Sequence, residues 1–224
     1  AWYCPINAQT TVGYVCGETM DGYHCSERAA AVAIRHLKAA LETDVVDALC
    51  LDFEWDAHNR RLPLQLVQVA VGNCGPHVFD AQHVRNVLRI ENFGSLMGLS
   101  VPIKVLHDAR ADTVTLRSNL SADFAFASLF DTQVAHRVLT GESHDRRGLD
   151  DVLKHWLGVR IEKKSGHIKR FMSTPGAWAQ RPLPEEMVSY AADDVRYLPQ
   201  LFKKMLEEAM SRGVLDEILA KILA

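Results

Sequence analysis

The sequence predicts a mixed β-sheet with helices packed against it, in an α/β or α+β arrangement. Three observations lead to this fold class. Short apolar runs typical of strands occur up to residue 131, helical patterns separate several of them, and the chain beyond residue 131 is mainly helical. The 224 residues are enough for one sizeable hydrophobic core or at most two small ones.

The chain is expected to begin with an arm and a helix. Residues 1–21 show no clear period and contain Pro, Gly and Thr, so we expect an extended arm or loop. A helical pattern then begins at Ser26, which is the candidate N-cap. Its apolar positions recur at helical spacing and keep one face toward a core: Ala31, Ile34, Leu37, Ala40 and Leu41.

Three strand-like segments follow, and we expect them to form a three-stranded meander. Turn signals at residues 60–63 and 73–76 separate them. The predicted strands are residues 48–55, 64–71 and 77–80.

The remainder of the chain first alternates helix and strand and then becomes helical. We expect a helix at about 81–93, a strand at 103–107, a helix at 108–118 and a short fifth strand at 128–131. Further helices are predicted at roughly 132–140, 149–157, 184–210 and 213–223. Between them, residues 162–181 form one long irregular stretch, and loops of that length are often functional.

Composition excludes several classes of protein. The apolar and charged fractions, 48% and 24%, are ordinary for a globular domain, and the net charge of −3 provides no global basic field for nucleic acid. Five cysteines without a CxxC pair argue against a zinc site or a disulfide framework. Cys50 and Cys74 are interpreted as small buried hydrophobes. A reducing intracellular compartment, nucleus or cytoplasm, is therefore expected.

The chain shows neither a membrane span nor a signal peptide. No apolar run approaches the length that crosses a bilayer, and residues 1–5 lack a charged and apolar leader. An initiator Met is also missing, so the chain is interpreted as a piece of a longer protein whose targeting signals and partner domains lie elsewhere.

Three pairs of residues carry the chemistry. Asp52 and Glu54 are two apart on a strand and therefore share one face, while Phe53 points to the core. The helix at 108–118 places Asp112 one turn after Asp108, and Asp108 itself has an alternative role as an N-cap or first-turn acid. Asp112 is placed too far into the helix for that role.

Tyr190 and Asp194 are also one helical turn apart. Four carboxylates from three segments suit two Mg²⁺ or Mn²⁺ ions about 4 Å apart, with the Tyr190 phenol placing the attacking water. Solvated acids at a strand end are the alternative for Asp52 and Glu54. We find no GxSxG, Walker or HExxH motif that would indicate a different chemistry.

These segments resemble the RNase D-like branch of the DEDD 3′-5′ exonucleases, in the tyrosine variant. The similarity covers about residues 22–210, and the motifs occur in the family's order. They are residues 51–54, 64–70, 104–107 followed by Asp112, 130–133, 148–159, 178–183 and 190–198. The form of residues 107–112 is most similar to an Egalitarian-related subgroup, some members of which have lost carboxylates and act as RNA-binding adaptors.

The resemblance implies an RNase H-like α/β fold, a mixed sheet of about five strands flanked by helices with a helical C-terminal half. It implies a metal-dependent 3′-5′ exonuclease that acts on the single-stranded 3′ end of nucleic acid. Asp52, Glu54, Asp112 and Asp194 would be metal ligands, and these four plus Tyr190 catalytic. RNA is favoured as the substrate. A DNA exonuclease and a catalytically silent RNA-binding scaffold are the alternatives.

The candidate substrate contacts are one basic stretch and two single residues, Trp55 and His107. The basic stretch Lys163, Lys164, His167, Lys169 and Arg170 is interpreted as a phosphate-binding segment, with a solvated charge run as the alternative. The sequence departs from the common family pattern near 162–177. Trp55 is placed to stack on a terminal base or to pack in the core, and His107 to face the cleft or to hold a strand end.

The expected organisation is an N-terminal arm at 1–21, an exonuclease domain at 22–210 and a C-terminal helix at 211–224. That helix is amphipathic and packs either on this domain or on a protein partner. Its apolar positions are Val214, Leu215, Ile218, Leu219 and Ile222.

Overall fold

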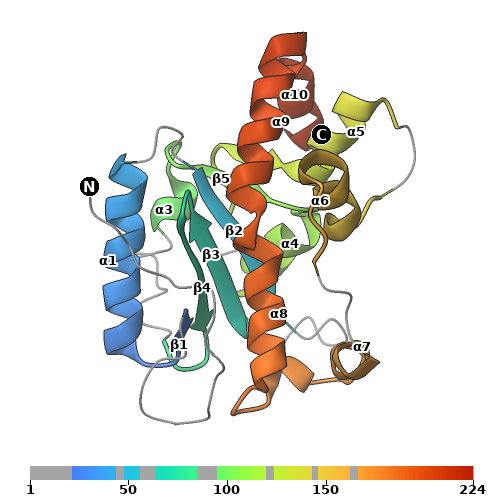
Figure 1. Cartoon of the computed structure of the whole chain (residues 1–224). Coiled ribbons are helices and arrows are strands. Elements are labelled where there is room, and N and C mark those ends of the chain that lie inside the picture. The colour runs from blue at the N-terminus through green and yellow to red at the C-terminus, as the bar shows by residue number, and fades with distance from the viewer. Residues whose placement is uncertain are drawn as a thin grey trace.

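A computed structural model describes residues 22–43, 48–55, 64–84, 95–119, 124–142, 146–161 and 166–223. The described residues form one mixed sheet with helices on both faces and a helical extension at the C-terminal end (Figure 1). The predicted α/β fold class is confirmed. The expected arm at 1–21 lies outside the described residues, as does most of the helix expected at 81–93.

The sheet has six strands in the order β1-β4-β3-β2-β5-β6. The expected meander is confirmed, because β2 pairs antiparallel with β3 and β3 with β4. The outer strands pair in parallel: β1 with β4, β5 with β2, and β6 with β5. The strand bounds are β1 (Tyr23–His24), β2 (Ala48–Glu54), β3 (Leu66–Val71), β4 (Cys74–Asp80), β5 (Ile103–Leu106) and β6 (Leu129–Asp131).

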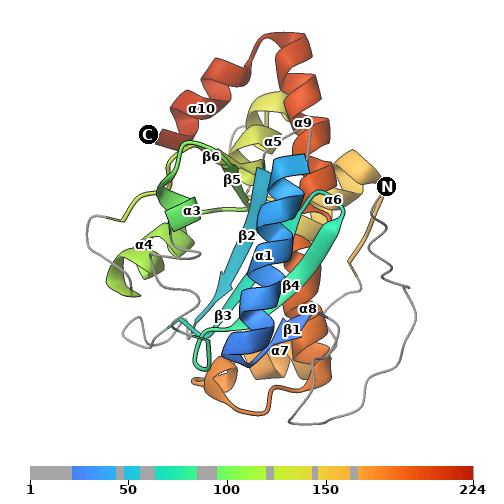
Figure 2. The same ribbon diagram turned by 90° about the vertical axis from the view of Figure 1, so that its left-hand side faces the viewer.

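One face of the sheet is covered by α1 (Glu27–Thr43), and the opposite face by α8 (Glu185–Arg196) and α9 (Leu198–Arg212). Figures 1 and 2 show α1 on one side of the strands and the two later helices on the other. The hydroxyl of Ser26 accepts a hydrogen bond from the Ala29 N–H at 3.3 Å, consistent with its predicted capping role. The side chains that α1 buries are Ala30, Ala33, Ile34, Leu37 and Leu41.

The C-terminal helix α10 packs on the same domain. α10 packs against α5, α9 and β6, and its Ile218 side chain is fully buried, so this helix belongs to the domain's own core. Leu219 and Leu223 remain 38% and 87% exposed on α10. The bounds are α3 (Ser95–Gly98), α4 (Arg110–Asn119), α5 (Thr132–Thr140), α6 (Leu149–Leu157), α7 (Gly166–Met172) and α10 (Leu215–Leu223).

Several boundaries differ from the prediction. The helix expected at 184–210 is two helices that meet at Tyr197, because Pro199 near the start of α9 has no N–H to continue the helical ladder. The stretch expected to be irregular at 162–181 contains α7 and a 3₁₀ turn, Ala177–Ala179. β4 begins at Cys74, within the expected turn, and that cysteine is half-buried instead of buried.

β1 was not expected, because two residues are too short to show the alternation that identifies a strand. Among the described cysteines, Cys25, Cys50 and Cys74, none forms a disulfide. In the described ranges no helix is both long enough and apolar enough to cross a membrane.

Candidate active site

Three carboxylates converge at the end of β2. Oxygen atoms of Asp52, Glu54 and Asp194 all lie within 4.8 Å of one another. Over the part of the chain that the structure describes, this is the one group of three or more His, Cys, Asp or Glu side chains that meets so closely. Like charges at this separation repel strongly, so the arrangement favours a bound cation.

Strand alternation places the first two acids. Leu49, Leu51 and Phe53 on β2 belong to the core beneath α1, as was expected for Phe53. The alternate positions, beginning with Ala48 and Cys50, belong to the opposite face beneath α9. Asp52 and Glu54 continue this second series, and they therefore point toward the face on which α8 and α9 pack.

α8 supplies the third acid and the phenol. The helix packs on β2, β3 and β4 through a cluster that includes Met187, Val188 and Ala191. Tyr190 and Asp194 are one turn apart on α8 and both face the acids of β2. Asp193, one position away, instead pairs with Arg196 at 2.6 Å.

The Tyr190 hydroxyl is held beside the carboxylates. It is hydrogen-bonded to Asp194, and because a carboxylate only accepts, the phenol is the donor. Burial raises the pKa of Tyr190, and the negative charges of Asp194, Glu54 and Asp52 raise it further. The phenol therefore stays protonated at neutral pH and remains a hydrogen-bond donor.

Asp112 lines the same cleft but lies deeper. The cleft has a volume of about 250 Å³, and Asp112 is 4% exposed. Burial raises the pKa of Asp112 to about 8, with further contributions from the charges of Asp108 and Asp131. The helix α4 begins at Arg110, so Asp112 lies in its first turn. The expectation that Asp112 lies beyond the first turn was wrong.

Asp131 performs the capping role that had been an alternative for Asp108. Its carboxylate accepts the backbone N–H groups of Asp108 and Ala109 at 3.1 and 2.9 Å, and also caps α5. Asp108 itself adopts a φ of 60° and pairs with Arg110 at 3.0 Å. The Asp131 carboxylate thereby ties the start of α4, and with it Asp112, to the end of β6.

Two of the predicted substrate-contact residues, Trp55 and His107, line the cleft. Trp55 lines the cleft beside Glu54. His107 also lines it, but its Nε2 donates to the Arg147 carbonyl at 2.9 Å and its Nδ1 lies 2.9 Å from the Thr132 hydroxyl. Both ring nitrogens are thus engaged in holding the end of β5.

Of the basic segment, only part is described. Lys163 and Lys164 lie outside the described residues, and the side chains of His167 and Lys169 are not described. Arg170 is exposed on α7. Two residues further, Met172 lines the cleft.

The sequence did not indicate that residues 172–178 contribute to a pocket beside Trp55. A second pocket of about 150 Å³ adjoins the cleft and shares Phe53, Glu54, Trp55 and Met172 with it. Thr174, Ala177 and Trp178 complete its lining. These residues come from a stretch that was expected to be irregular, and no periodic pattern identified them.

The donor set fits a hard divalent cation. Mg²⁺ and Mn²⁺ prefer carboxylate oxygens, and Mg²⁺ binds them at about 2.0–2.1 Å, so oxygens on opposite sides of one ion are about 4 Å apart. The oxygens of Asp52, Glu54 and Asp194, within 4.8 Å of one another, match that spacing. Asp112 in the same cleft adds a fourth carboxylate.

The chain is similar in sequence to known nucleases. The sequence profile of a family described as 3′-5′ exonuclease matches residues 25–209. Ribonuclease D from Sphingobium indicum is 42% identical over 86 residues, which are 38% of this chain and 19% of that protein. Exosome complex component 10 from Homo sapiens is 35% identical over 163 residues, 73% of this chain and 17% of that protein.

The fold is similar to that of Escherichia coli RNase D, described as an exoribonuclease involved in structured RNA processing. The TM-score is 0.68 at 22% sequence identity, covering 89% of this chain and 48% of that one. The chain spans less than a fifth of the length of the two curated relatives, which are covered to 19% and 17%.

Proposed function

The chain belongs to the 3′-5′ exonuclease family, and from this premise we propose that it removes nucleotides hydrolytically from the 3′ end of single-stranded RNA. The observation that carries the proposal is the convergence of Asp52, Glu54 and Asp194 within 4.8 Å, beside the Tyr190 phenol and in one cleft with Asp112. No covalent nucleophile is needed for this chemistry.

Asp52, Glu54, Asp112 and Asp194 would hold two divalent cations, Mg²⁺ or Mn²⁺. Such ions, when bound, lower the pKa of a water and stabilise charge on the scissile phosphate and the leaving oxygen. The four carboxylates supply the negative charge that retains the ions. Because Asp112 has a raised pKa, ion binding is coupled to release of its proton near neutral pH.

Tyr190 would position the attacking water. Its hydroxyl donates to Asp194 and therefore lies beside the acidic cluster, and a phenol oxygen can accept a hydrogen bond as well as donate one. A water that donates to this oxygen is held beside the carboxylates in one orientation. Protonation of the phenol is maintained because burial and the neighbouring acids raise its pKa.

The adjoining pocket suits a nucleobase. Trp55, Met172 and Trp178 contribute apolar side chains to its lining, next to Glu54. Aromatic stacking with a base is worth about 1–3 kcal/mol and tolerates any sequence. The basic residues Lys163, Lys164, His167, Lys169 and Arg170, with His107 at the cleft wall, are proposed to contact the phosphates and sugars.

RNA is proposed over DNA because the curated relative with the highest identity quoted above carries the name Ribonuclease D. Residues 22–210 are proposed as the exonuclease domain. The exposed Leu219 and Leu223 on the C-terminal helix offer a surface for a protein partner, and a nuclear or cytoplasmic location is proposed from the cysteine usage.

The test is cleavage of matched 5′-labelled single-stranded RNA and DNA in Mg²⁺, Mn²⁺ or EDTA. Stepwise shortening from the 3′ end, faster on RNA and absent in EDTA, is expected. Asp52→Asn should reduce kcat by roughly 10²–10⁴-fold with an unchanged far-UV spectrum, whereas Asp193→Asn should not. Faster cleavage of DNA would overturn the substrate assignment. Binding without shortening would indicate an RNA-binding scaffold and overturn the enzyme assignment.

A further inference from the structure

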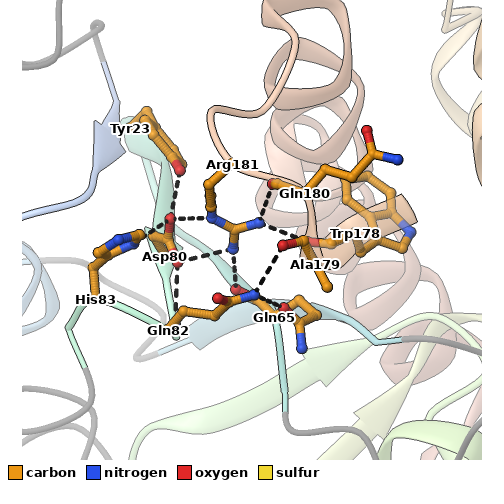
Figure 3. A network of polar contacts seen from close by, with 9 residues as sticks. All are labelled: Tyr23, Gln65, Asp80, Gln82, His83, Trp178, Ala179, Gln180 and Arg181. Carbon is orange, nitrogen blue, oxygen red and sulfur yellow. Dashed lines mark hydrogen bonds and ion pairs between the residues drawn. The ribbon is translucent and has the colours of Figure 1, made fainter. Parts of the chain in front are cut away.

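A buried ion pair joins two segments far apart in the chain. Asp80, at the end of β4, is fully buried, and its carboxylate faces the guanidinium of Arg181 in the segment that leads into α8 (Figure 3). Arg181 Nε donates to Oδ2 at 2.5 Å and Nη2 donates to Oδ1 at 2.8 Å. This two-point contact fixes both the distance and the orientation of the pair.

Arg181 uses all of its donors. A guanidinium has five N–H groups, and two of them bind Asp80. The other three bind the carbonyl oxygens of Trp178 at 2.6 Å, Gln180 at 2.7 Å and Gln65 at 3.3 Å. A lysine, with three donors on a single nitrogen, cannot reproduce this set.

Asp80 is equally engaged. It also accepts from the Tyr23 hydroxyl at 2.7 Å, from the Gln82 N–H at 3.0 Å and from His83 Nδ1 at 2.9 Å. Burial acts to raise the pKa of Asp80, but the hydrogen bonds and the charge of Arg181 outweigh it and hold the pKa below its ordinary value. The carboxylate is therefore ionised, and the pair is a charged one.

On the sheet side, Asp80 lies in the same cross-strand row as Glu54, one of the acids of the cleft. Glu54, Leu66 and Asp80 form one cross-strand row, because Glu54 pairs with Leu66 and Leu66 with Asp80. Their side chains share the face that α8 covers, about 10 Å apart from first to last. Gln65, whose carbonyl binds Arg181, donates its own N–H to the Glu54 carbonyl at 2.8 Å.

On the helix side, the network reaches Tyr190. Arg181 binds the backbone of Trp178, and the Trp178 ring stacks on the Tyr190 ring with centroids 6.3 Å apart and planes inclined by 29°. Arg181 also lies four residues before α8 begins. The guanidinium thus touches both halves of the acidic site through one intermediate residue on each side.

We propose that Arg181 and Asp80 are positioning residues that set the separation between the β2 acids and the α8 ligands, and thereby the affinity for divalent cations. The inference rests on the proposed function. A buried ion pair is by itself a weak source of stability. Its distinctive contribution is geometric, because the planar fork fixes the approach of α8 to the strands.

The test is Mn²⁺ binding in the absence of substrate, followed by the electron paramagnetic resonance signal of free Mn²⁺, together with kcat on RNA and thermal unfolding. The variants are Arg181→Lys, Arg181→Met and Tyr23→Phe. The control is Arg212→Met. Arg212 also pairs with an acid, Glu208, and binds a carbonyl, that of Leu139, but none of these three residues lines the cleft.

Arg181→Lys keeps the charge but not the fork, and so separates geometry from stability. We expect it to stay folded with an unfolding temperature lowered by the lost carbonyl hydrogen bonds, while its Mn²⁺ dissociation constant rises about tenfold and kcat falls by about tenfold or more. Arg181→Met should show a larger effect, Tyr23→Phe a smaller one, and Arg212→Met less than about twofold in either quantity.

The outcomes distinguish a failure of the positioning role from a failure of the proposed function. If wild type binds Mn²⁺ but Arg181→Lys and Tyr23→Phe bind it equally well, the positioning role is overturned and the proposed function stands. Should Arg181→Met fail to fold, the lysine and phenylalanine variants still decide. A wild-type chain that neither binds Mn²⁺ nor cleaves RNA overturns the proposed function together with the inference.

Discussion

Replacing Asp112 with Asn should stabilise the metal-free protein while removing its activity. Asp112 is 4% exposed, and burial is the largest cause that raises its pKa from an ordinary 3.8 to about 8. A buried carboxyl of this kind is tolerated in its neutral form and destabilises the folded state when ionised. Asparagine has nearly the same shape and no charge to desolvate.

The sign and size of this stabilisation follow from the difference in the pKa of Asp112 between the folded and unfolded states. Because the folded pKa lies above the unfolded one, the contribution of Asp112 to stability is complete below about pH 4 and is lost as the pH rises to about 8. One pKa unit corresponds to about 1.4 kcal/mol, so a shift of about four units sets an upper limit of roughly 6 kcal/mol. Solvent access and relaxation reduce this to roughly 1–3 kcal/mol.

The measurement is the unfolding temperature of both proteins in EDTA, from about pH 5 to about pH 9. At about 2–4 °C per kcal/mol for a chain of this size, the variant should gain roughly 5 °C at alkaline pH and almost nothing in acid. Asp193→Asn, at a partly exposed ion-paired site, should show no such pH-dependent gain. A difference between Asp112→Asn and wild type that shrinks as the pH rises would refute the reasoning.

Three further outcomes are expected. Trp55→Ala should raise KM for RNA about tenfold with a smaller change in kcat, whereas Trp55→Phe should keep most of the affinity; equal KM values would remove Trp55 from the substrate site. Burial lowers the pKa of His24 and of His77 to about 4, so their contribution to stability is complete above about pH 6.5 and is lost as the pH falls toward 4. Urea unfolding of a His24→Phe variant should therefore show a flatter acid branch, and an unchanged slope would contradict this. The Phe202 ring is 1% exposed and packs edge-to-face on the Phe130 ring, with ring centroids 4.9 Å apart. Phe202→Ala should lower the free energy of unfolding by about 3–5 kcal/mol without altering Mn²⁺ affinity.

Local periodicity accounts for the parts of the site that were predictable. Two residues along a strand and four along a helix necessarily share a face, so Asp52 with Glu54 and Tyr190 with Asp194 were placed correctly relative to each other from spacing alone. Helix ends were predictable for the same local reason. Gly141 and Gly158 adopt positive φ at the ends of α5 and α6, which glycine does without strain.

Features that depend on contacts between distant segments were not predictable in this way. β1 is a two-residue strand that exists because β4 offers it an edge. The pocket beside Trp55 is closed by residues of α7 and the turn after it, whose own sequence carries no period. The break at Tyr197 follows from the local position of Pro199, so the single helix predicted at 184–210 was wrong.

The sequence by itself determined which acids point together, which family the motifs resemble, and the class of sheet that carries them. Only the tertiary structure decided that oxygens of residues 52, 54 and 194 come within 4.8 Å of one another, that Asp112 is buried deeply enough to change its pKa, and that Arg181 meets Asp80 across 101 positions. The physical reason is that side-chain direction is set by the local backbone, whereas distance and desolvation are set by how α8 packs on the sheet.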